Sequence, residues 1–293
     1  MPQLFHIDSF TRTPMRGNPA GVVLEADSLT DMQMQDMARE LKHSETAFVL
    51  RAKGPGHDLH IRFFSPTVEV SVCGHATIAA HYALALCSGQ ARSVIQLTGA
   101  GLQRVRTLRE GDNWRIEIDQ GRPQFGAVLD DGWRRRVAQA LGVPEGLAAG
   151  RPLQVVSTGH SKVIVPLPDD FALDQLTPDM SALTAMSSEL GCNGWYPFVL
   201  AGDSATEGRM FAPAIGIQED PVTGNANGPL GAYLVRHRLM RHDGAKLEFD
   251  GHQGRALRRD GVVRVRVAVK DGAPEAVTIG GDAVILFSAP LAI

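Results

Sequence analysis

The sequence predicts an α+β fold of two pseudo-symmetric halves, each a mixed or antiparallel β wrap around one buried central helix. Three observations support this prediction: alternating apolar segments typical of strands, one very apolar helix in each half, and short motifs that recur in the same order. The recurring pairs are Phe-Val-Leu at 48–50 and 198–200, Gly-His-Ala at 74–76 and Gly-Asn-Ala at 224–226, Leu-Thr at 29–30 and 176–177, and Phe-Ser-Pro at 64–66 and Phe-Ala-Pro at 211–213. Four such pairs indicate a duplicated half.

The first central helix follows Cys73-Gly74-His75 and is apolar on nearly every face through residue 87. A helix without a polar stripe is normally buried, and its first-turn N–H groups then need a partner. Gly74 lets a ligand approach the backbone, and the helix dipole favours an anion. The pattern is therefore typical of a socket for a carboxylate or phosphate, although an ordinary capped core helix gives the same pattern.

The second copy begins at Thr223-Gly224-Asn225, directly after Asp220, and leads into an apolar helix of small residues. Because the Gly-polar-Ala opening occurs in both halves, we expect two helix starts that face one acidic substrate. Asp220 could instead have only a structural role, as the acidic residue of an Asp-Pro turn.

In the first half, strands are expected at residues 4–10, 20–24, 46–51, 59–64, 93–97 and 114–118 because apolar and β-branched residues alternate there. Residues 11–19 form a turn-rich loop. Thr30 caps a helix, and Gln33 completes a capping box.

The segment 119–128, rich in Gly and Pro, is the best candidate for a boundary, which gives an N-terminal half at 1–122 and a C-terminal half at 123–293. This division leaves open whether the last strand crosses from the C-terminal half into the N-terminal half. The second half contains helices at 133–141 and from Thr177, and strands at 154–158, 162–165, 262–268 and 277–287. Regular βαβ alternation and a GxGxxG motif are missing, which argues against a dinucleotide-binding fold.

The composition indicates a globular protein and gives no sign of a nucleic-acid-binding, membrane or secreted protein. The chain has 293 residues, 44% of them hydrophobic and 21% charged, with a net charge of −3. A chain of this length can bury a sizeable core in two domains. No charge block points to nucleic acid or to a membrane surface, and no signal peptide or spanning segment is recognisable. Three cysteines without a CxxC pair fit a reducing cytoplasm.

Proton-transfer chemistry would need titratable groups near the helix starts. Glu45 precedes a buried strand, and its counterpart in the repeat, Asn193 or Gly194, carries no acid. One-sided proton transfer would use such an asymmetric carboxylate, although a strand-start Glu is usually just a solvated charge. His75 is either a catalytic group or a capping side chain.

Cys73 precedes a helix start, which would lower the pKa of its thiol and make it a possible base. Its counterpart is Thr223, so a racemase with two thiols is not supported. No spacing of His, Cys and Asp indicates a metal site, and neither a GxSxG elbow nor a P-loop is present.

Four motifs, at residues 16–20, 44–48, 73–77 and 219–226, carry a resemblance to a known family. Together they resemble the PhzF-like family of phenazine-biosynthesis-like isomerases, with the diaminopimelate-epimerase-like fold, and in particular its YddE-type bacterial members. The resemblance covers essentially the whole chain. It implies an active site between the halves, a homodimer and no metal or organic cofactor.

The family's catalytic Glu falls on Glu45, its Gly-His pair on Gly74 and His75, its Asp on Asp220, and its Thr-Gly-Ser segment on Thr223, Gly224 and Asn225. The phenazine isomerase has Ser at Asn225 and Ala at Cys73. Both departures lie in the pocket, so its substrate is not carried over. Asn18 and Cys73 complete the expected substrate contacts.

These expectations describe a cytoplasmic, cofactor-independent isomerase that moves a proton on a small carboxylate-bearing metabolite. Glu45, Asp220 and His75 would be catalytic, and the N–H groups at Gly74–His75 and Gly224–Asn225 would hold the carboxylate or a developing oxyanion. Two alternatives stay open: an amino-acid racemase or epimerase that uses Cys73, and a non-catalytic small-molecule binding protein.

Overall fold

The computed structural model describes residues 2–143 and 146–292. It divides the chain into two compact units of mixed α and β structure, which confirms the α+β class. The first unit comprises the chain up to Asp119 together with the segment from Gly280 onward, and the second comprises Gln120–Ile279. The last strand begins in the second unit and ends in the first, since it continues past Ile279. The predicted C-terminal half at 123–293 therefore included a final segment that belongs to the first unit.

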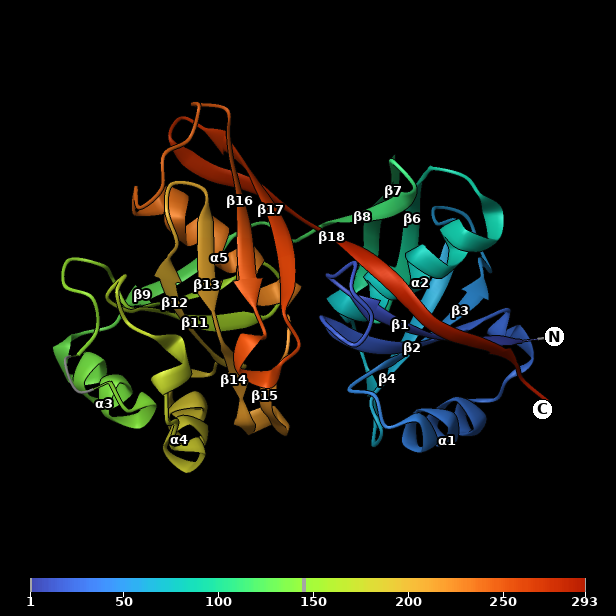
Figure 1. Cartoon of the computed structure of the whole chain (residues 1–293), viewed down its shortest axis with the longest axis horizontal. Helices are drawn as coiled ribbons and strands as arrows, with labels where there is room; N and C mark the ends of the chain where they lie inside the picture. Colours follow the sequence, from blue (N-terminus) through green and yellow to red (C-terminus); the bar gives the residue numbers. More distant parts are fainter. Residues whose placement is uncertain (1, 144–145, 293) are drawn as a thin grey trace. The chain divides into compact units, whose positions relative to one another are not determined.

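Among its described residues, the first unit contains two α-helices and eight strands of its own, followed by the end of β18 (Figure 1). Its elements are β1 (Gln3–Ser9), β2 (Asn18–Leu24), the short 3-10 helix η1 (Ala26–Ser28), α1 (Asp31–Leu41), β3 (Thr46–Arg51), β4 (Leu59–Phe64), β5 (Glu69–Val70), α2 (Gly74–Ser88), β6 (Arg92–Thr98), β7 (Gly101–Glu110), β8 (Asn113–Asp119) and, from Gly280 on, β18 (Ala273–Pro290).

Strand pairing closes this unit into a ring. The order is β1-β2-β3-β4-β6-β7-β8-β18 and back to β1. Among the pairs with a determined register, β2–β3 and β4–β6 are parallel and the others are antiparallel. A closed sheet of eight strands has an interior that side chains can fill, and here one helix fills it.

Helix α2 lies inside this ring, in contact with β1, β2, β3, β7 and β8 (Figure 1). Its side chains from His75 to Ala83 are all buried, as expected for a helix without a polar stripe. Its last turn reaches the surface, where Leu86 is 41% exposed. Within the helix, His81 is buried and makes a 2.8 Å hydrogen bond with Gln96 Oε1, and burial lowers the pKa of His81 to about 4.

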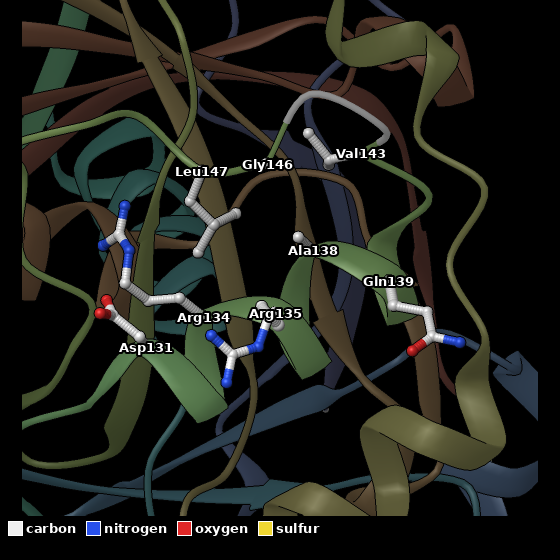
Figure 2. Close-up of a pocket in the computed structure, with 8 residues that line it drawn as sticks. All are labelled: Asp131, Arg134, Arg135, Ala138, Gln139, Val143, Gly146 and Leu147. Atoms are coloured by element: carbon white, nitrogen blue, oxygen red, sulfur yellow. The ribbon is translucent and has the colours of Figure 1, made fainter.

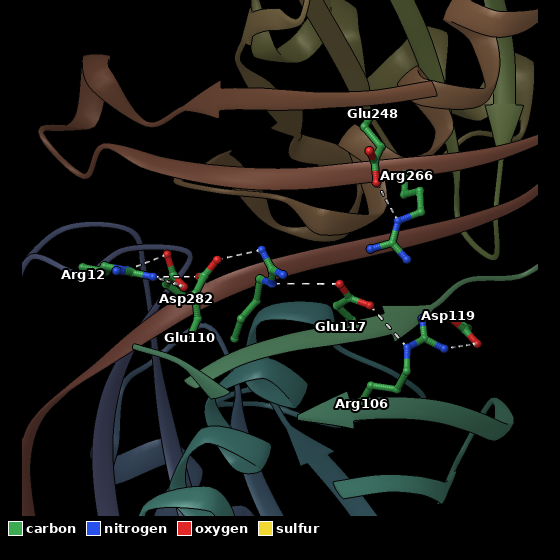
Figure 3. Close-up of polar contacts among 9 residues, drawn as sticks. Arg12, Arg106, Glu110, Glu117, Asp119, Glu248, Arg266 and Asp282 are labelled. Atoms are coloured by element: carbon green, nitrogen blue, oxygen red, sulfur yellow. Dashed lines mark hydrogen bonds and ion pairs between the residues drawn. The ribbon is translucent and has the colours of Figure 1, made fainter. Parts of the chain in front are cut away.

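Ion pairs link the loop after β1 to β7 and β18, and link β7 to β8 (Figure 3). Arg12 contacts Asp282 of β18 at 2.9 Å and Glu110 of β7 at 2.8 Å. Arg106 of β7 contacts Asp119 of β8 at 2.6 Å. Exposed pairs of this kind each contribute about 0–1 kcal/mol, so they support the ring closure while the buried core holds the unit together.

Helix α1 begins as the sequence predicts. Thr30 accepts a hydrogen bond from Gln33 N, and the Gln33 side chain in turn accepts one from Thr30 N, so the expected capping box is confirmed.

The second unit contains three α-helices among its described residues. Its elements are β9 (Gln124–Val128), α3 (Asp131–Leu141), β10 (Gln154–Ser157), β11 (Ser161–Pro166), η2 (Leu173–Gln175), α4 (Met180–Leu190), β12 (Trp195–Leu200), β13 (Ala205–Gly208), β14 (Met210–Ala212), η3 (Pro213–Ile215), β15 (Ile217–Asp220), α5 (Gly224–Arg236), β16 (Lys246–Gln253), η4 (Arg255–Leu257), β17 (Gly261–Lys270) and the first part of β18.

Seven of these strands pair in the series β9-β10-β11-β12-β13-β16-β17. The pairs β11–β12 and β13–β16 are parallel and the rest are antiparallel. One antiparallel pair separates the two parallel pairs, as β3–β4 separates β2–β3 from β4–β6 in the first unit. Helix α5 packs against β10, β11, β16 and β17. A duplication of the two units stays a prediction from the recurring motifs.

Small residues let α5 pack tightly against β16 and β17. A Cβ added at Gly231 would come within 2.8 Å of methyl carbons of Val265 and Val267. We therefore expect Gly231→Val to lower the free energy of unfolding by about 1–3 kcal/mol through overpacking, measured by urea denaturation. Gly54, which has no atom within 4 Å of an added Cβ, provides the control variant Gly54→Ala, and equal stability of the two variants would contradict this packing argument.

One expected boundary was wrong. The helix expected from Thr177 begins later, at Met180, because Asp179 caps it by accepting a hydrogen bond from Ala182 N. Several strands were not expected, among them β7, β9 and β16. The β7 sequence has three arginines, and only two of its side chains are buried, so it shows little apolar alternation. None of the helices in the described ranges is long and apolar enough to cross a membrane.

Candidate functional site

Helix α2 starts with Gly74, and Cys73 occupies the N-cap position without a capping hydrogen bond from its side chain. The first-turn N–H groups of any helix lack acceptors within the helix. Thr77 supports the start by donating its backbone N–H and its hydroxyl to Cys73 O, at 3.0 and 2.7 Å. The Cys73 side chain is consequently left to meet other groups.

Three side chains converge at this helix start. The Cys73 thiol donates to Glu45 Oε2 at 3.5 Å, and its Sγ lies 3.3 Å from His75 Nδ1. His75 Nε2 lies 3.4 Å from Glu45 Oε2. Glu45 directly precedes β3, whereas Cys73 is the N-cap residue of α2 and His75 lies in its first turn. The cluster therefore depends on packing between two elements of the first unit.

The Glu45 carboxyl is mostly enclosed, with 14% of its side chain exposed. Burial raises the pKa of Glu45 above its ordinary value, and hydrogen bonds from Ser44 and Cys73 partly oppose that rise. Glu45 points toward His75 and Cys73 rather than into solvent, unlike the usual strand-start Glu.

Further residues hold His75 in place. Ser44 Oγ lies 3.3 Å from His75 Nε2, and Ser9 donates its hydroxyl to His75 O at 2.7 Å. Ser9 ends β1 opposite Asn18, the first residue of β2, and Asn18 is fully buried. The structure thus places Asn18, Glu45, Cys73, Gly74 and His75 within the first unit, at or beside the start of α2.

The second unit presents its own helix start. Asp220 ends β15, and Thr223, the N-cap residue of α5, donates its hydroxyl to Asp220 Oδ2. Gly224 and Asn225 form the first turn of α5. Asp220, Thr223, Gly224 and Asn225 therefore lie together, as the sequence predicts.

A buried amide network fixes the turn before α5. Gln253 of β16 accepts from Thr223 N at 3.0 Å and donates to Asp220 O at 2.8 Å. Asn227 donates to Thr223 O at 3.0 Å and accepts from the Tyr196 hydroxyl at 3.0 Å. Buried polar groups that are satisfied in this way rigidify their surroundings, so Asp220 and Thr223 are held in a defined position.

Glu219 has a structural role. Arg209 forms a two-point ion pair with Glu219, with both contacts at 2.8 Å, and also donates to Leu173 O at 2.9 Å. Both partners are close to 90% buried. Since Arg209 occupies both Glu219 oxygens, Asp220 is the better candidate for chemistry at this helix start.

A buried lysine lies near the same turn. Lys162 of β11 is 3% exposed, and burial lowers its pKa to about 8 despite the opposing influence of Cys192 and Asp220. Its ammonium donates to Ser161 O at 3.4 Å. Its sequence gives no signal of a functional lysine, because residues 162–165 have the pattern of an ordinary buried strand.

A separate surface pocket of about 520 Å³ lies along α3 in the second unit (Figure 2). Its lining includes Asp131, Arg134 and Gln139. Arg134 already donates to Arg151 O and Ala148 O, at 2.8 and 2.7 Å. The pocket contains none of the residues that converge at α2 or α5, so it is not the candidate site.

Comparison with known proteins shows which family this chain resembles. The profile of the phenazine biosynthesis-like proteins (PhzC-PhzF) matches residues 7–289. The chain belongs to this family. Of its relatives, the uncharacterised isomerase YddE of Salmonella typhimurium is 52% identical over 295 residues, which cover 100% of this chain and 99% of that protein.

Two further relatives from this PhzF family bear on the function. The trans-2,3-dihydro-3-hydroxyanthranilate isomerase of Pseudomonas chlororaphis is 34% identical, over 79% of each chain. The crystal structure of a PhzF-family phenazine biosynthesis protein from Bacillus anthracis matches with a TM-score of 0.89 and 30% identity, and covers 100% of both chains. Because its relatives are named isomerases, the chain is an enzyme of this PhzF-type isomerase class.

Sequence motifs identified both helix starts, but they did not identify the residues that hold the site residues in place. Ser44 stood inside a recognised motif without an assigned role, and Ser9, Lys162 and Gln253 gave no signal. The sequence spacing also failed to indicate that Glu45, Cys73 and His75 come together, since Glu45 is distant from the other two along the chain.

Proposed function

We propose that this enzyme moves a proton on a small carboxylic-acid substrate without a cofactor, with Glu45 as the general base. The observation that carries this proposal is the placement of the Glu45 carboxylate at the start of α2, within 3.5 Å of both Cys73 and His75. A general base must lie within hydrogen-bond reach of the proton it takes, and an enclosed carboxylate at a helix start, where an anionic substrate group can bind, meets that need.

In this mechanism, N–H groups at Gly74 and His75 bind the substrate carboxylate or the oxyanion that develops next to the reacting carbon. Glu45 removes the proton from the activated carbon and returns it to another carbon of the substrate, which shifts a double bond. His75 holds the Glu45 carboxylate or passes the proton on. Asp220, Thr223, Gly224 and Asn225 are proposed as further substrate contacts, and contact of one substrate with both helix starts stays a prediction.

A racemase or epimerase that uses Cys73 is the second candidate. Two bases on opposite faces of one carbon must be separated by about 6 Å, since each sits roughly 3 Å from that carbon. Cys73 Sγ and Glu45 Oε2 are 3.5 Å apart, so these two groups would act from the same side. An epimerase would therefore need a different opposing base, and isomerisation by Glu45 is the simpler use of this geometry.

The test uses the wild-type enzyme in D2O with a panel of small unsaturated and amino carboxylic acids, including trans-2,3-dihydro-3-hydroxyanthranilate. We expect one member of the panel to change its double-bond position, detected by proton NMR, with its configuration at other centres retained. Inversion at a stereocentre without a double-bond shift would support the epimerase instead. Binding of a carboxylate without any chemical change or exchange would support a binding protein.

A further inference from the structure

Lys162 of β11 is a buried cation with little hydrogen bonding. The residue is 3% exposed, and its ammonium donates one long hydrogen bond, of 3.4 Å, to Ser161 O. Within residues 2–143 and 146–292, no carboxylate forms an ion pair with it. A lysine ammonium has three N–H donors, and buried charges in proteins are normally paired. The unused donors therefore make Lys162 a candidate for binding an anion.

The alternation of side chains along β11 directs Lys162 toward α5. Val163 and Val165 pack into a core cluster that also contains Val137 of α3 and Leu183 of α4. The buried members of this cluster include none from α5, which nevertheless packs against β11. Successive side chains of a strand point to opposite faces, so Lys162 points to the face of β11 on which α5 lies.

Three titratable groups surround the Lys162 ammonium. Burial lowers the pKa of Lys162, and the nearby Cys192 and Asp220 oppose that fall. Burial and the charge of Lys162 in turn lower the pKa of His160. Electrostatic influences of this kind weaken with distance, so the ammonium lies near Asp220. The Asp220 carboxylate accepts from the hydroxyl of Thr223, the N-cap residue of α5, which places Lys162 beside the start of this helix.

The start of α5 favours an anion next to Lys162. Gly224 and Asn225 form the first turn, whose N–H groups lack acceptors within the helix. At pH 7 the Lys162 side chain is mainly protonated, since its pKa is about 8. Its unit charge and the helix dipole, together about +1.5, outweigh the single negative charge of Asp220.

We propose that Lys162 and the N–H groups of Gly224 and Asn225 form a carboxylate-binding site in the second unit. That this carboxylate belongs to the substrate rests on the proposed function. The two helix starts then differ in task. The Glu45 carboxylate at α2 takes the proton, whereas the Lys162 cation at α5 selects substrates by an acidic group.

The test uses succinate as the probe and the full chain with 13C-labelled lysine, whose five lysines give five Cε signals. The signal that is lost in Lys162→Met identifies Lys162. At pH 7 we expect succinate to shift this signal saturably. With succinate bound, a pH titration should place the pKa of Lys162 above about 9, because the bound carboxylate favours the charged ammonium.

The pH dependence of binding provides a second readout. Succinate affinity should fall about tenfold between pH 7 and pH 9, because the ammonium of the free protein loses its proton over this range. Burial lowers the pKa of His160 and raises that of Cys192, so neither group changes its charge in this window.

Lys162→Met should bind succinate at least about tenfold more weakly and without this pH trend, measured from the Gly224 and Asn225 amide signals. The exposed Lys53→Met is the matched control and should bind as the wild type does. Equal binding by Lys162→Met, binding that leaves the Lys162 signal unchanged, or no binding at all would overturn the site.

Turnover of Glu45→Gln separates this site from the proposed function. Loss of that turnover together with succinate binding that ignores Lys162 would refute only the carboxylate site. Binding that depends on Lys162 together with full turnover by Glu45→Gln would retain the carboxylate site and exclude Glu45 as the base.

Discussion

Replacing Glu45 by glutamine is expected to lower turnover by about 10²–10⁴-fold, the usual contribution of a positioned general base. Glutamine preserves the shape and can still accept hydrogen bonds from Ser44 and Cys73, the groups that contact the carboxylate. It has no carboxylate with which to take a proton. The effect should therefore appear mainly in kcat, measured on the substrate identified from the carboxylic-acid panel.

Glu40→Gln is the matched control for this measurement, because Glu40 is an exposed carboxylate of the same unit and should leave kcat unchanged. Circular dichroism and thermal unfolding of both variants establish that the fold is retained. Full turnover by the folded Glu45→Gln enzyme would exclude Glu45 as the base and would direct attention to Cys73 and Asp220.

Replacing Lys162 by methionine is expected to stabilise the protein at pH 7 by up to about 3 kcal/mol. The pKa of Lys162 falls from 10.5 to about 8 because burial disfavours the charged ammonium. The unfolded chain therefore binds a proton between pH 8 and 10.5 that the folded chain does not, so the stability of the wild type rises with pH over this window. Methionine has a similar shape and no charge to bury.

The pH dependence distinguishes this explanation from a simple packing effect. The stability difference between Lys162→Met and the wild type, measured by urea denaturation, should be largest at pH 7 and should shrink as the pH rises from 8 to 10.5. The exposed Lys53→Met is the control and should show no such trend. A difference that stays constant with pH would show that the buried charge does not cost stability.

Local sequence patterns were sufficient to predict the helices that position the candidate site. The all-apolar run after Cys73 predicted a buried helix, and α2 fills the interior of a strand ring. The Thr30 and Gln33 pair predicted the start of α1 correctly. Glycine followed by a polar residue and alanine identified the first turns of both α2 and α5. Each of these signals is contained within a few consecutive residues, which is why sequence alone reveals them.

Features that depend on tertiary packing could not be predicted from local patterns. The approach of Glu45 to Cys73 and His75 requires the start of β3 to lie beside the start of α2. No spacing rule expresses that, and only the family resemblance assigned these residues to one site. The burial of Lys162 results from its surroundings, since lysine in a strand is normally exposed. Gln253 acts on the turn before α5 from a distant strand. The strand β7 escaped notice because its exposed, charged positions mask the alternation.

The central claim is that the Glu45 carboxylate takes a proton from carbon, and solvent deuterium exchange tests it most directly. The substrate is incubated in D2O with wild-type or Glu45→Gln enzyme, and deuterium at the reacting carbons is followed by NMR. The Glu45 side chain is 14% exposed, so its carboxyl proton can exchange with D2O before transfer to the second carbon. We predict incorporation by the wild type and none above the enzyme-free background by the variant. Incorporation by folded Glu45→Gln enzyme at the wild-type rate would contradict the claim.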